Sequence, residues 1–233
     1  MLISIIIPCY NEINTLSDLI KLVRAEDHID QEIILIDDCS NDGTTELIKD
    51  EIEKLVSKVV YHKSNLGKGA AVRSGIIEAS GDIILIQDAD LEYNPKNYSD
   101  LLKPIFDGYA DVVYGSRFIG HGPNRAIYFW NKIGNKVVTL LCNFCTNLNL
   151  TDMETCYKVF KRELVTNITL KENKFGIEPE LTIKFAKQGA RIYEVGIDYY
   201  GRSFEEGKKI TWKDGIAAIY HILKYSWFKR IKE

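Results

Sequence analysis

Short aliphatic runs alternate with segments of helical periodicity along the first 90 residues. Four runs have the length and β-branched content of buried strands: 3–8, 32–38, 58–63 and 82–88. Between them lie three predicted helices: 15–26, a segment from Thr44 onward, and a glycine-bearing loop that leads into a helix within 65–80. Thr15 is the expected N-cap of the first helix. This alternation predicts right-handed βαβ units around a mostly parallel sheet.

The second half of the chain continues the alternation less regularly. Its predicted elements are a strand at 110–118, an amphipathic helix at 125–144, a strand and turn at 153–163, a helix at 178–189 and a strand at 191–200. No internal repeat and no Pro/Ser-rich linker interrupts this order. We therefore expect one domain of the α/β class, with helices covering a mostly parallel central sheet.

Composition narrows the range of functions. With 233 residues, 45% of them hydrophobic, the chain can bury a large core. Its net charge of −3 gives no overall basic field, so a nucleic-acid partner is not expected. Five cysteines, an odd number, and the lack of a signal-peptide pattern indicate a reducing cytoplasm. The longest uncharged stretch, 137–151, is too short to span a bilayer.

Polar residues follow three of the predicted strands, in the segments 8–12, 37–44 and 88–92. The carboxyl ends of parallel strands share one edge of a sheet, so these segments should converge there and form a site. In the third segment, Asp88 and Asp90 follow a buried strand as Asp-x-Asp, which points both carboxylates to the same side. Such a pair suits Mg²⁺ or Mn²⁺ held partly by substrate phosphates, although the same pattern also occurs in solvated turns.

The segment "NLGKGAA" (65–71) precedes a predicted helix and has two interpretations. It could contact a phosphate through the helix N-terminus, or it could be a tight turn with a solvated Lys68. It has neither the Walker A spacing nor the G-x-G-x-x-G pattern of a first βα turn, which argues against an NTPase and a dinucleotide-binding protein.

Five motifs in order resemble the family 2 glycosyltransferases: "IIIPCYNE", "LIDDCSNDGT", "NLGKGAAVRSGI", "QDADLEYNP" and "YGSRF". Within that family the chain is most similar to the dolichyl- or polyprenyl-phosphate sugar synthases, over about residues 1–205. The segments 151–160, 175–181 and 199–210 extend the similarity. The resemblance implies a GT-A type nucleotide-diphospho-sugar transferase fold, a divalent metal and inversion at the anomeric carbon.

The resemblance also assigns roles to residues. It puts Pro8, Tyr10, Glu12 and Asp37 or Asp38 around the nucleoside. It puts Asp88 and Asp90 at the metal and diphosphate, with Glu92 where several of these synthases carry a Gln.

Basic residues complete this expected site. Arg117, Arg202 and Lys209 are able to hold a diphosphate or an acceptor phosphate. Asp152 matches the position of a candidate base or acceptor-orienting residue in this branch, and Glu178 and Glu180 compete for that role. A lipid-phosphate acceptor is already anionic and needs little help from a base, whereas a hydroxyl acceptor needs one.

The C-terminal segment, 208–233, combines seven Lys or Arg residues with five aromatic residues on a predicted helix. Such a helix suits an anionic membrane surface, or it packs on the domain with its basic face in solvent. Phe129 and Trp130 in the helix at 125–144 offer a second interfacial contact. We therefore expect a GT-A domain at 1–207 and an appended helix at 208–233, in a cytoplasmic protein that associates peripherally with the membrane.

The leading hypothesis is transfer of mannose or glucose from GDP-mannose or UDP-glucose to a polyprenyl phosphate. The alternative acceptor is a soluble or glycan hydroxyl in polysaccharide or glycoconjugate synthesis. A nucleotidyltransferase is disfavoured because "IIIPCYNE" is not a glycine-rich pyrophosphate loop. A non-catalytic binding protein is disfavoured by the intact Asp-x-Asp.

Overall fold

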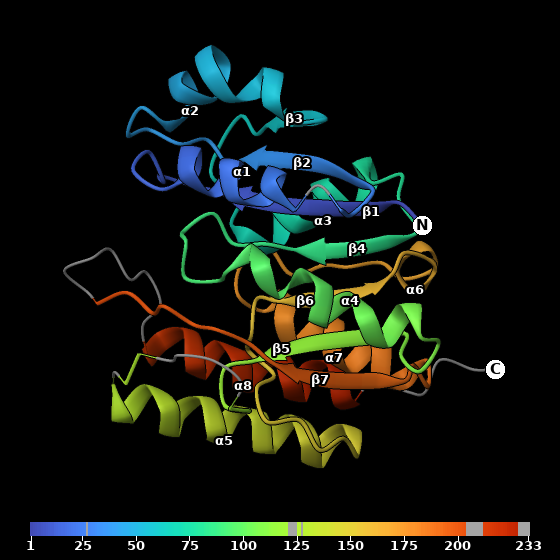
Figure 1. Cartoon of the computed structure of the whole chain (residues 1–233). Helices are drawn as coiled ribbons and strands as arrows, with labels where there is room; N and C mark the ends of the chain where they lie inside the picture. The colour runs from blue at the N-terminus through green and yellow to red at the C-terminus, as the bar shows by residue number, and fades with distance from the viewer. Residues whose placement is uncertain (27, 121–124, 127, 204–211, 228–233) are drawn as a thin grey trace.

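The computed structural model describes residues 1–26, 28–120, 125–126, 128–203 and 212–227 (Figure 1). Its strands form one sheet in the order β3-β2-β1-β4-β6-β5-β7. The strands are β1 (Ile3–Cys9), β2 (Gln31–Asp37), β3 (Lys58–Tyr61), β4 (Ile83–Ile86), β5 (Val112–Ser116), β6 (Lys158–Lys161) and β7 (Ile192–Gly196). The α-helices are α1 (Leu16–Ala25), α2 (Thr44–Leu47), α3 (Lys68–Glu78), α4 (Tyr98–Phe106), α5 (Phe129–Thr146), α6 (Glu163–Thr166), α7 (Ile177–Lys187) and α8 (Trp212–Trp227).

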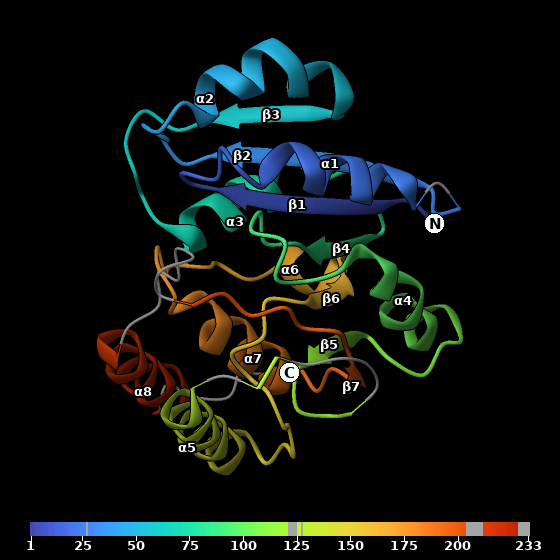
Figure 2. The same cartoon turned by 60° about the vertical axis from the view of Figure 1, so that its left-hand side comes forward.

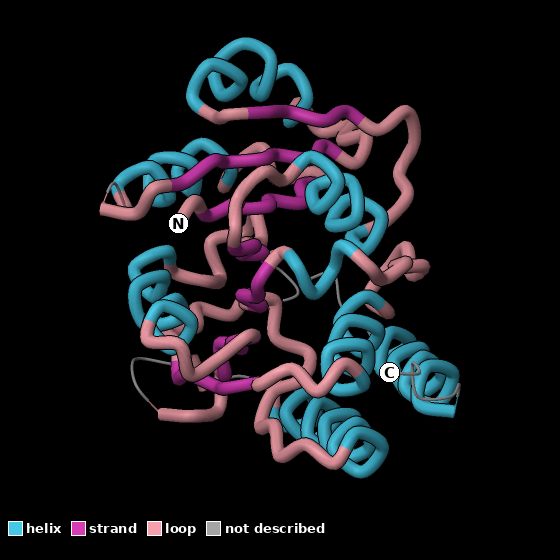
Figure 3. The backbone as a smooth tube through the Cα atoms, turned by 90° about the vertical axis from the view of Figure 1, so that its right-hand side faces the viewer, coloured by secondary structure: helices cyan, strands magenta, loops and turns pink. Residues whose placement is uncertain are grey.

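Parallel pairing dominates the sheet, as the sequence predicted. β1 pairs with β2 and β4 in parallel, so that Ile5 lies beside both Ile33 and Leu85. β5 and β7 are also parallel, and β6 alone among the described strands runs against its neighbours β4 and β5. Every residue of β1 and β4 is buried, because α1 and α4 cover one face of the sheet and α3 and α7 the other (Figures 1 and 3).

Helix α3 approaches the sheet through Gly75. A Cβ atom built on Gly75 would lie 2.3 Å from Cγ2 of Ile6 and 2.9 Å from Cδ1 of Ile36. Only a residue without a side chain allows this contact, so Gly75 sets the distance between α3 and strands β1 and β2.

Two local features differ from the sequence predictions. Helix α4 was not predicted, although Tyr98, Leu101, Leu102 and Ile105 have helical spacing and are buried. Pro104 stands inside this helix and weakens its signal in the sequence. Thr15 precedes α1 but makes no capping bond; its hydroxyl oxygen lies 2.8 Å from Oε2 of Glu12 and 2.9 Å from the Ala89 carbonyl oxygen.

Helices α5 and α8 lie side by side at one end of the molecule (Figure 2). The predicted amphipathic helix is present as α5, but it buries only Val138, Thr139 and Cys142. Six of its large apolar side chains are exposed, and α8 adds three more. We call these nine residues the α5/α8 apolar surface: Phe129, Trp130, Ile133, Val137, Leu140, Phe144, Ile216, Tyr220 and Leu223. None of the described helices has the length and apolar character needed to cross a bilayer.

The C-terminal helix predicted within 208–233 corresponds to α8. It packs against α5 and α7 through buried residues that include Ala218 and Ile222. The expected boundary at 207/208 lies outside the described residues, as do Ile127 and Lys209.

Candidate active site

The turns after β1, β2 and β4 share an unusual backbone conformation. Asn11, Cys39 and Leu91 adopt positive φ values of 55°, 64° and 60°. Non-glycine residues rarely adopt this conformation, and such strain concentrates at functional sites. All three turns lie at the edge where the parallel strands end, as expected for the segments 8–12, 37–44 and 88–92.

Arg202 contacts several carboxylates at this edge. Its guanidinium lies 3.2 Å from Oε2 of Glu12 and 2.9 Å from Oδ2 of Asp90. Glu92 accepts a hydrogen bond of 2.8 Å from the backbone N–H of Arg202 and another of 2.8 Å from the Tyr199 hydroxyl. The segment after β7 therefore crosses the segment 88–92, and residues about 110 positions apart share one site.

Asp88 has a different cation beside it. Its Oδ1 lies 2.9 Å from Nζ of Lys68, and the same ammonium lies 3.2 Å from Oε1 of Glu178. Lys68 is largely buried, with 17% of its side chain exposed, so the interpretation of a solvated lysine is wrong. Burial and the charges of Asp88 and Glu92 raise the pKa of Asp90 to about 7, against the opposing effect of Arg202.

Arg117 and Asp152 form a bidentate ion pair on the other side of the site. Nε of Arg117 donates to Oδ2 of Asp152 and Nη2 donates to Oδ1, both at 2.7 Å. Asp152 is fully buried, and Arg117 holds its pKa below the usual range despite that burial. The guanidinium of Arg117 also lies over the Tyr199 ring, 5.2 Å from its centre. Tyr199 thus links the arginine to Glu92.

The residues expected around the nucleoside lie at the same edge. Pro8 pairs with Ile36 near the end of β1, and Tyr10 follows that strand. Asp37 accepts hydrogen bonds from the Ser40 amide and the Thr45 hydroxyl. Asp38 bonds His62 at 2.7 Å and accepts from the amides of Leu66 and Gly67. Both aspartates are buried and order the loops around them.

A divalent cation fits the donors at this edge. Asp88, Asp90 and Glu92 supply hard oxygen ligands, and Asp90, with 17% of its side chain exposed, lies among like charges that a cation would relieve. Among the described residues, no group of three His, Cys, Asp or Glu side chains is close enough to hold a metal by itself. Arg202 instead contacts two of these three carboxylates and Glu12. An ion here would need further oxygen ligands, which phosphate groups supply.

Sequence reasoning overlooked two charged residues, the partly buried Glu154 and the fully buried Lys158. Lys158 is 1% exposed and its ammonium donates to the carbonyl oxygens of Met153 and Thr155 at 2.8 and 2.6 Å. Both residues precede or begin β6, whose reversed direction brings its start to the site edge. The strand-end rule considers only the residues after a strand, and so it missed these two.

Glu180, one of the candidate bases, has a structural role. Its carboxylate accepts hydrogen bonds from the amides of Lys171 and Glu172 at 2.8–3.0 Å and pairs with Lys184 at 2.5 Å. Glu178, by contrast, lies next to Lys68 at the site.

The sheet order and the acidic edge define an α/β enzyme of the GT-A type. The sequence profile described as Glycosyl transferase family 2 matches residues 4–169. The chain belongs to the family 2 glycosyltransferases.

Curated relatives agree with this family. The chain is 32% identical to glycosyltransferase AglJ of Haloferax volcanii over 201 residues, covering 86% of this chain and 63% of that protein. It is 29% identical to the dolichol-phosphate mannosyltransferase of Pyrococcus furiosus over 230 residues, covering 97% and 64%. It is 31% identical to an undecaprenyl-phosphate 4-deoxy-4-formamido-L-arabinose transferase of Aeromonas hydrophila, covering 89% and 62%. The chain thus spans less than two thirds of the length of these relatives.

Solved structures show the same fold. Glucosyl-3-phosphoglycerate synthase of Mycobacterium tuberculosis, in a complex with Mn²⁺, UDP and phosphoglyceric acid, superposes with a TM-score of 0.74 at 21% identity. The match covers 97% of this chain and 79% of that one. A structure of the same synthase contains Mg²⁺ and UDP.

Proposed function

We propose that this protein transfers a hexose, with inversion, from a nucleotide-diphosphate sugar to a polyprenyl phosphate. One observation carries the proposal: Tyr199 joins an acidic cluster to Arg117, whose side chain is 15% exposed. Its hydroxyl bonds Glu92 at 2.8 Å and its ring lies under Arg117. The side chain of Tyr199 therefore contacts both a site for a metal-bound diphosphate and a cation that could bind a second phosphate.

The donor would bind at the acidic side. Asp88, Asp90 and Glu92 would hold Mg²⁺ or Mn²⁺, which when bound neutralises negative charge on the leaving diphosphate. Arg202 and Lys68 bring cations to the same place and assist that neutralisation. The nucleoside would lie against the residues that end β1 and β2: Pro8, Tyr10, Glu12, Asp37 and Asp38.

The acceptor would bind at Arg117. A polyprenyl phosphate arrives as an anion, so its oxygen attacks the sugar without a general base. Asp152 is buried and occupied by two bonds to Arg117, an arrangement that suits orientation of the arginine better than proton abstraction. We therefore assign Asp152 an orienting role and Arg117 the role of phosphate ligand.

The lipid tail of such an acceptor needs an apolar environment, and the α5/α8 apolar surface offers one. Trp130 is 78% exposed and Phe144 87% exposed, with Lys132 and Lys136 also in solvent on α5. Aromatic and basic side chains on one helix favour the interface of an anionic membrane. We propose peripheral association through this surface, with the basic segment 208–233 and Lys209 contributing, on the cytoplasmic side.

The names of two relatives support the acceptor class, since they denote dolichol-phosphate and undecaprenyl-phosphate sugar transferases. The test is transfer from GDP-mannose, UDP-glucose and UDP-N-acetylglucosamine, with and without Mn²⁺, to a short polyprenyl phosphate or to a free sugar. We expect metal-dependent transfer from one donor to the polyprenyl phosphate, lost in Asp90→Ala. Equal transfer to the free sugar would instead support a hydroxyl acceptor, and turnover by Asp90→Ala would refute the site.

A further inference from the structure

Two carboxylate oxygens in the described part of the chain are sealed from solvent without a hydrogen-bond donor: Oε1 of Glu154 and Oε2 of Glu178. Glu178 is only 4% exposed. A buried carboxylate without donors is costly, by about 1–3 kcal/mol or more. Such oxygens in a folded protein need donors from outside the chain, which a bound ligand or an ordered water molecule can supply.

The neighbouring cations are already engaged elsewhere. Nζ of Lys158 donates to two carbonyl oxygens of the segment that precedes β6. Nζ of Lys68 contacts Asp88 and the other oxygen of Glu178, Oε1. Arg117 makes its two short bonds to Asp152. These nearby cations partly neutralise the negative charge of Glu154 and Glu178. The two unpaired oxygens still lack hydrogen-bond donors.

Each member of the pair is near one of the two places assigned to the substrates. On one side, Glu178 shares Lys68 with Asp88 of the donor site. On the other side, Glu154 follows Asp152, the partner of Arg117, by two residues, and the charges of both affect it. The charges of Glu154 and Glu178 also act directly on one another. A sugar in transit from diphosphate to acceptor phosphate would occupy the region between these sites.

We propose that Glu154 and Glu178 accept hydrogen bonds from hydroxyl groups of the transferred sugar and thereby select its configuration. The proposal rests on the proposed function and names the part of the site that recognises the sugar. Hydroxyl groups supply donors without adding charge, and a carboxyl group can accept a hydrogen bond whether it is ionised or protonated. A site built to bond a hydroxyl rejects analogues that lack it, because its own polar groups then stay unpaired.

The test compares two affinities in each variant. Dissociation constants are measured by calorimetry, with Mn²⁺, for the free nucleoside diphosphate and for the nucleotide sugar that the unmodified chain binds among GDP-mannose, UDP-glucose and UDP-N-acetylglucosamine. In Glu154→Gln we expect at least about tenfold weaker binding of the nucleotide sugar and less than about twofold change for the diphosphate. In Glu178→Gln we also expect the sugar to contribute less to the affinity for the nucleotide sugar. The affinity for the free diphosphate can change as well in this variant, because Lys68 loses an ionic partner.

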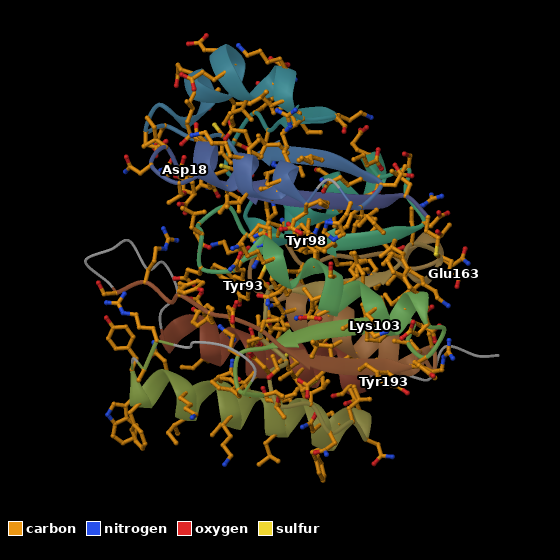
Figure 4. The ribbon with its side chains drawn as sticks, in the orientation of Figure 1. Asp18, Tyr93, Tyr98, Lys103, Glu163 and Tyr193 are labelled. Atoms are coloured by element: carbon orange, nitrogen blue, oxygen red, sulfur yellow. The ribbon has the colours of Figure 1, made fainter. Side chains whose placement is uncertain are left out.

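Deoxy-sugar donors sharpen the assignment. The unmodified chain should discriminate against at least one nucleotide deoxyhexose, and Glu154→Gln should lose that discrimination. Glu163→Gln is the matched control, since this exposed glutamate on α6 lies at the end of the sheet away from the site (Figure 4). It should bind every ligand as the unmodified chain does.

Two results would overturn this inference but leave the proposed function standing. The first is that the unmodified chain is active and both variants discriminate between sugars as it does. The second is that the variants lose equal affinity for the diphosphate and for the nucleotide sugar. Failure of the unmodified chain to bind any of the three nucleotide sugars would overturn the proposed function along with it.

Discussion

At the residue scale, Glu154 carries a pH dependence of known sign. Burial, the charge of Glu178 and the charge of Asp152 raise its pKa to about 8, while Lys158 and Arg117 oppose the shift. In the unfolded chain this group would ionise near the ordinary glutamate pKa of 4.5. The folded state therefore keeps a proton that the unfolded state loses, and stability from this group is present below pH 4.5 and lost as pH rises toward 8.

Glu154→Gln removes this penalty. We expect the melting temperature of the variant to match that of the unmodified chain near pH 5 and to exceed it by roughly 5–10 °C near pH 9. Melting curves across this pH range measure the difference. A constant difference at all pH values would contradict the raised pKa.

The Arg117–Asp152 pair gives a second prediction at this scale. Arg117→Ala leaves Asp152 as an unpaired charge in a fully buried place, which should cost about 3–5 kcal/mol of the free energy of unfolding. Urea unfolding of the variant measures the loss. Adding Asp152→Asn should recover part of it, because the unpaired charge is gone. No recovery in the double variant would show that packing, rather than charge, accounts for the loss.

The sequence predicted the position of a site residue only where that residue directly follows a strand. The strand-end rule located Asp88, Asp90 and Arg117, since each comes soon after a strand. The contacts of Arg202 with Glu12 and Asp90 depend on how the segment after β7 crosses the sheet edge, which sequence spacing does not encode.

At the element scale, two helical glycines should respond in opposite ways to the same substitution. Gly75→Ala forces a Cβ against Ile6 where α3 meets β1, and should destabilise the fold by about 1–3 kcal/mol. Gly134→Ala on the exposed side of α5 meets nothing within 4 Å and should stabilise by roughly 0.5–1 kcal/mol, because alanine is the better helix former. Chemical denaturation measures both. Stabilisation by Gly75→Ala would mean that α3 lies farther from β1.

Periodicity predicted most elements because helices and strands bury one face at a regular interval. Within the strand and turn expected at 153–163, the strand itself covers only Lys158–Lys161, and Asp152 and Met153 before it are buried at the site edge. In α5 the pattern predicted the helix but not its orientation: the apolar stripe faces outward, which periodicity alone does not reveal.

At the scale of the whole molecule, the α5/α8 apolar surface should determine membrane binding. We expect the chain to sediment with vesicles that contain anionic lipid, less so at high salt. Trp130→Ser with Leu140→Ser should reduce this binding at least about tenfold, because two exposed apolar side chains lose their burial in lipid. Ile77→Ser on α3, which is 79% exposed, is the matched control and should bind normally. Undiminished binding of the double variant would exclude this surface.

The reversed strand β6 joins two parts of the sheet that have no other pairing among the described strands, β3-β2-β1-β4 and β5-β7. Val159 is paired with Leu85 on one side and with Val113 on the other. We therefore expect the amide protons of β6 to exchange with deuterium only when the entire chain unfolds. Val159→Pro should separate one cooperative melting transition into two, so that the four residues of β6 decide whether the two parts of the sheet behave as a single thermodynamic unit.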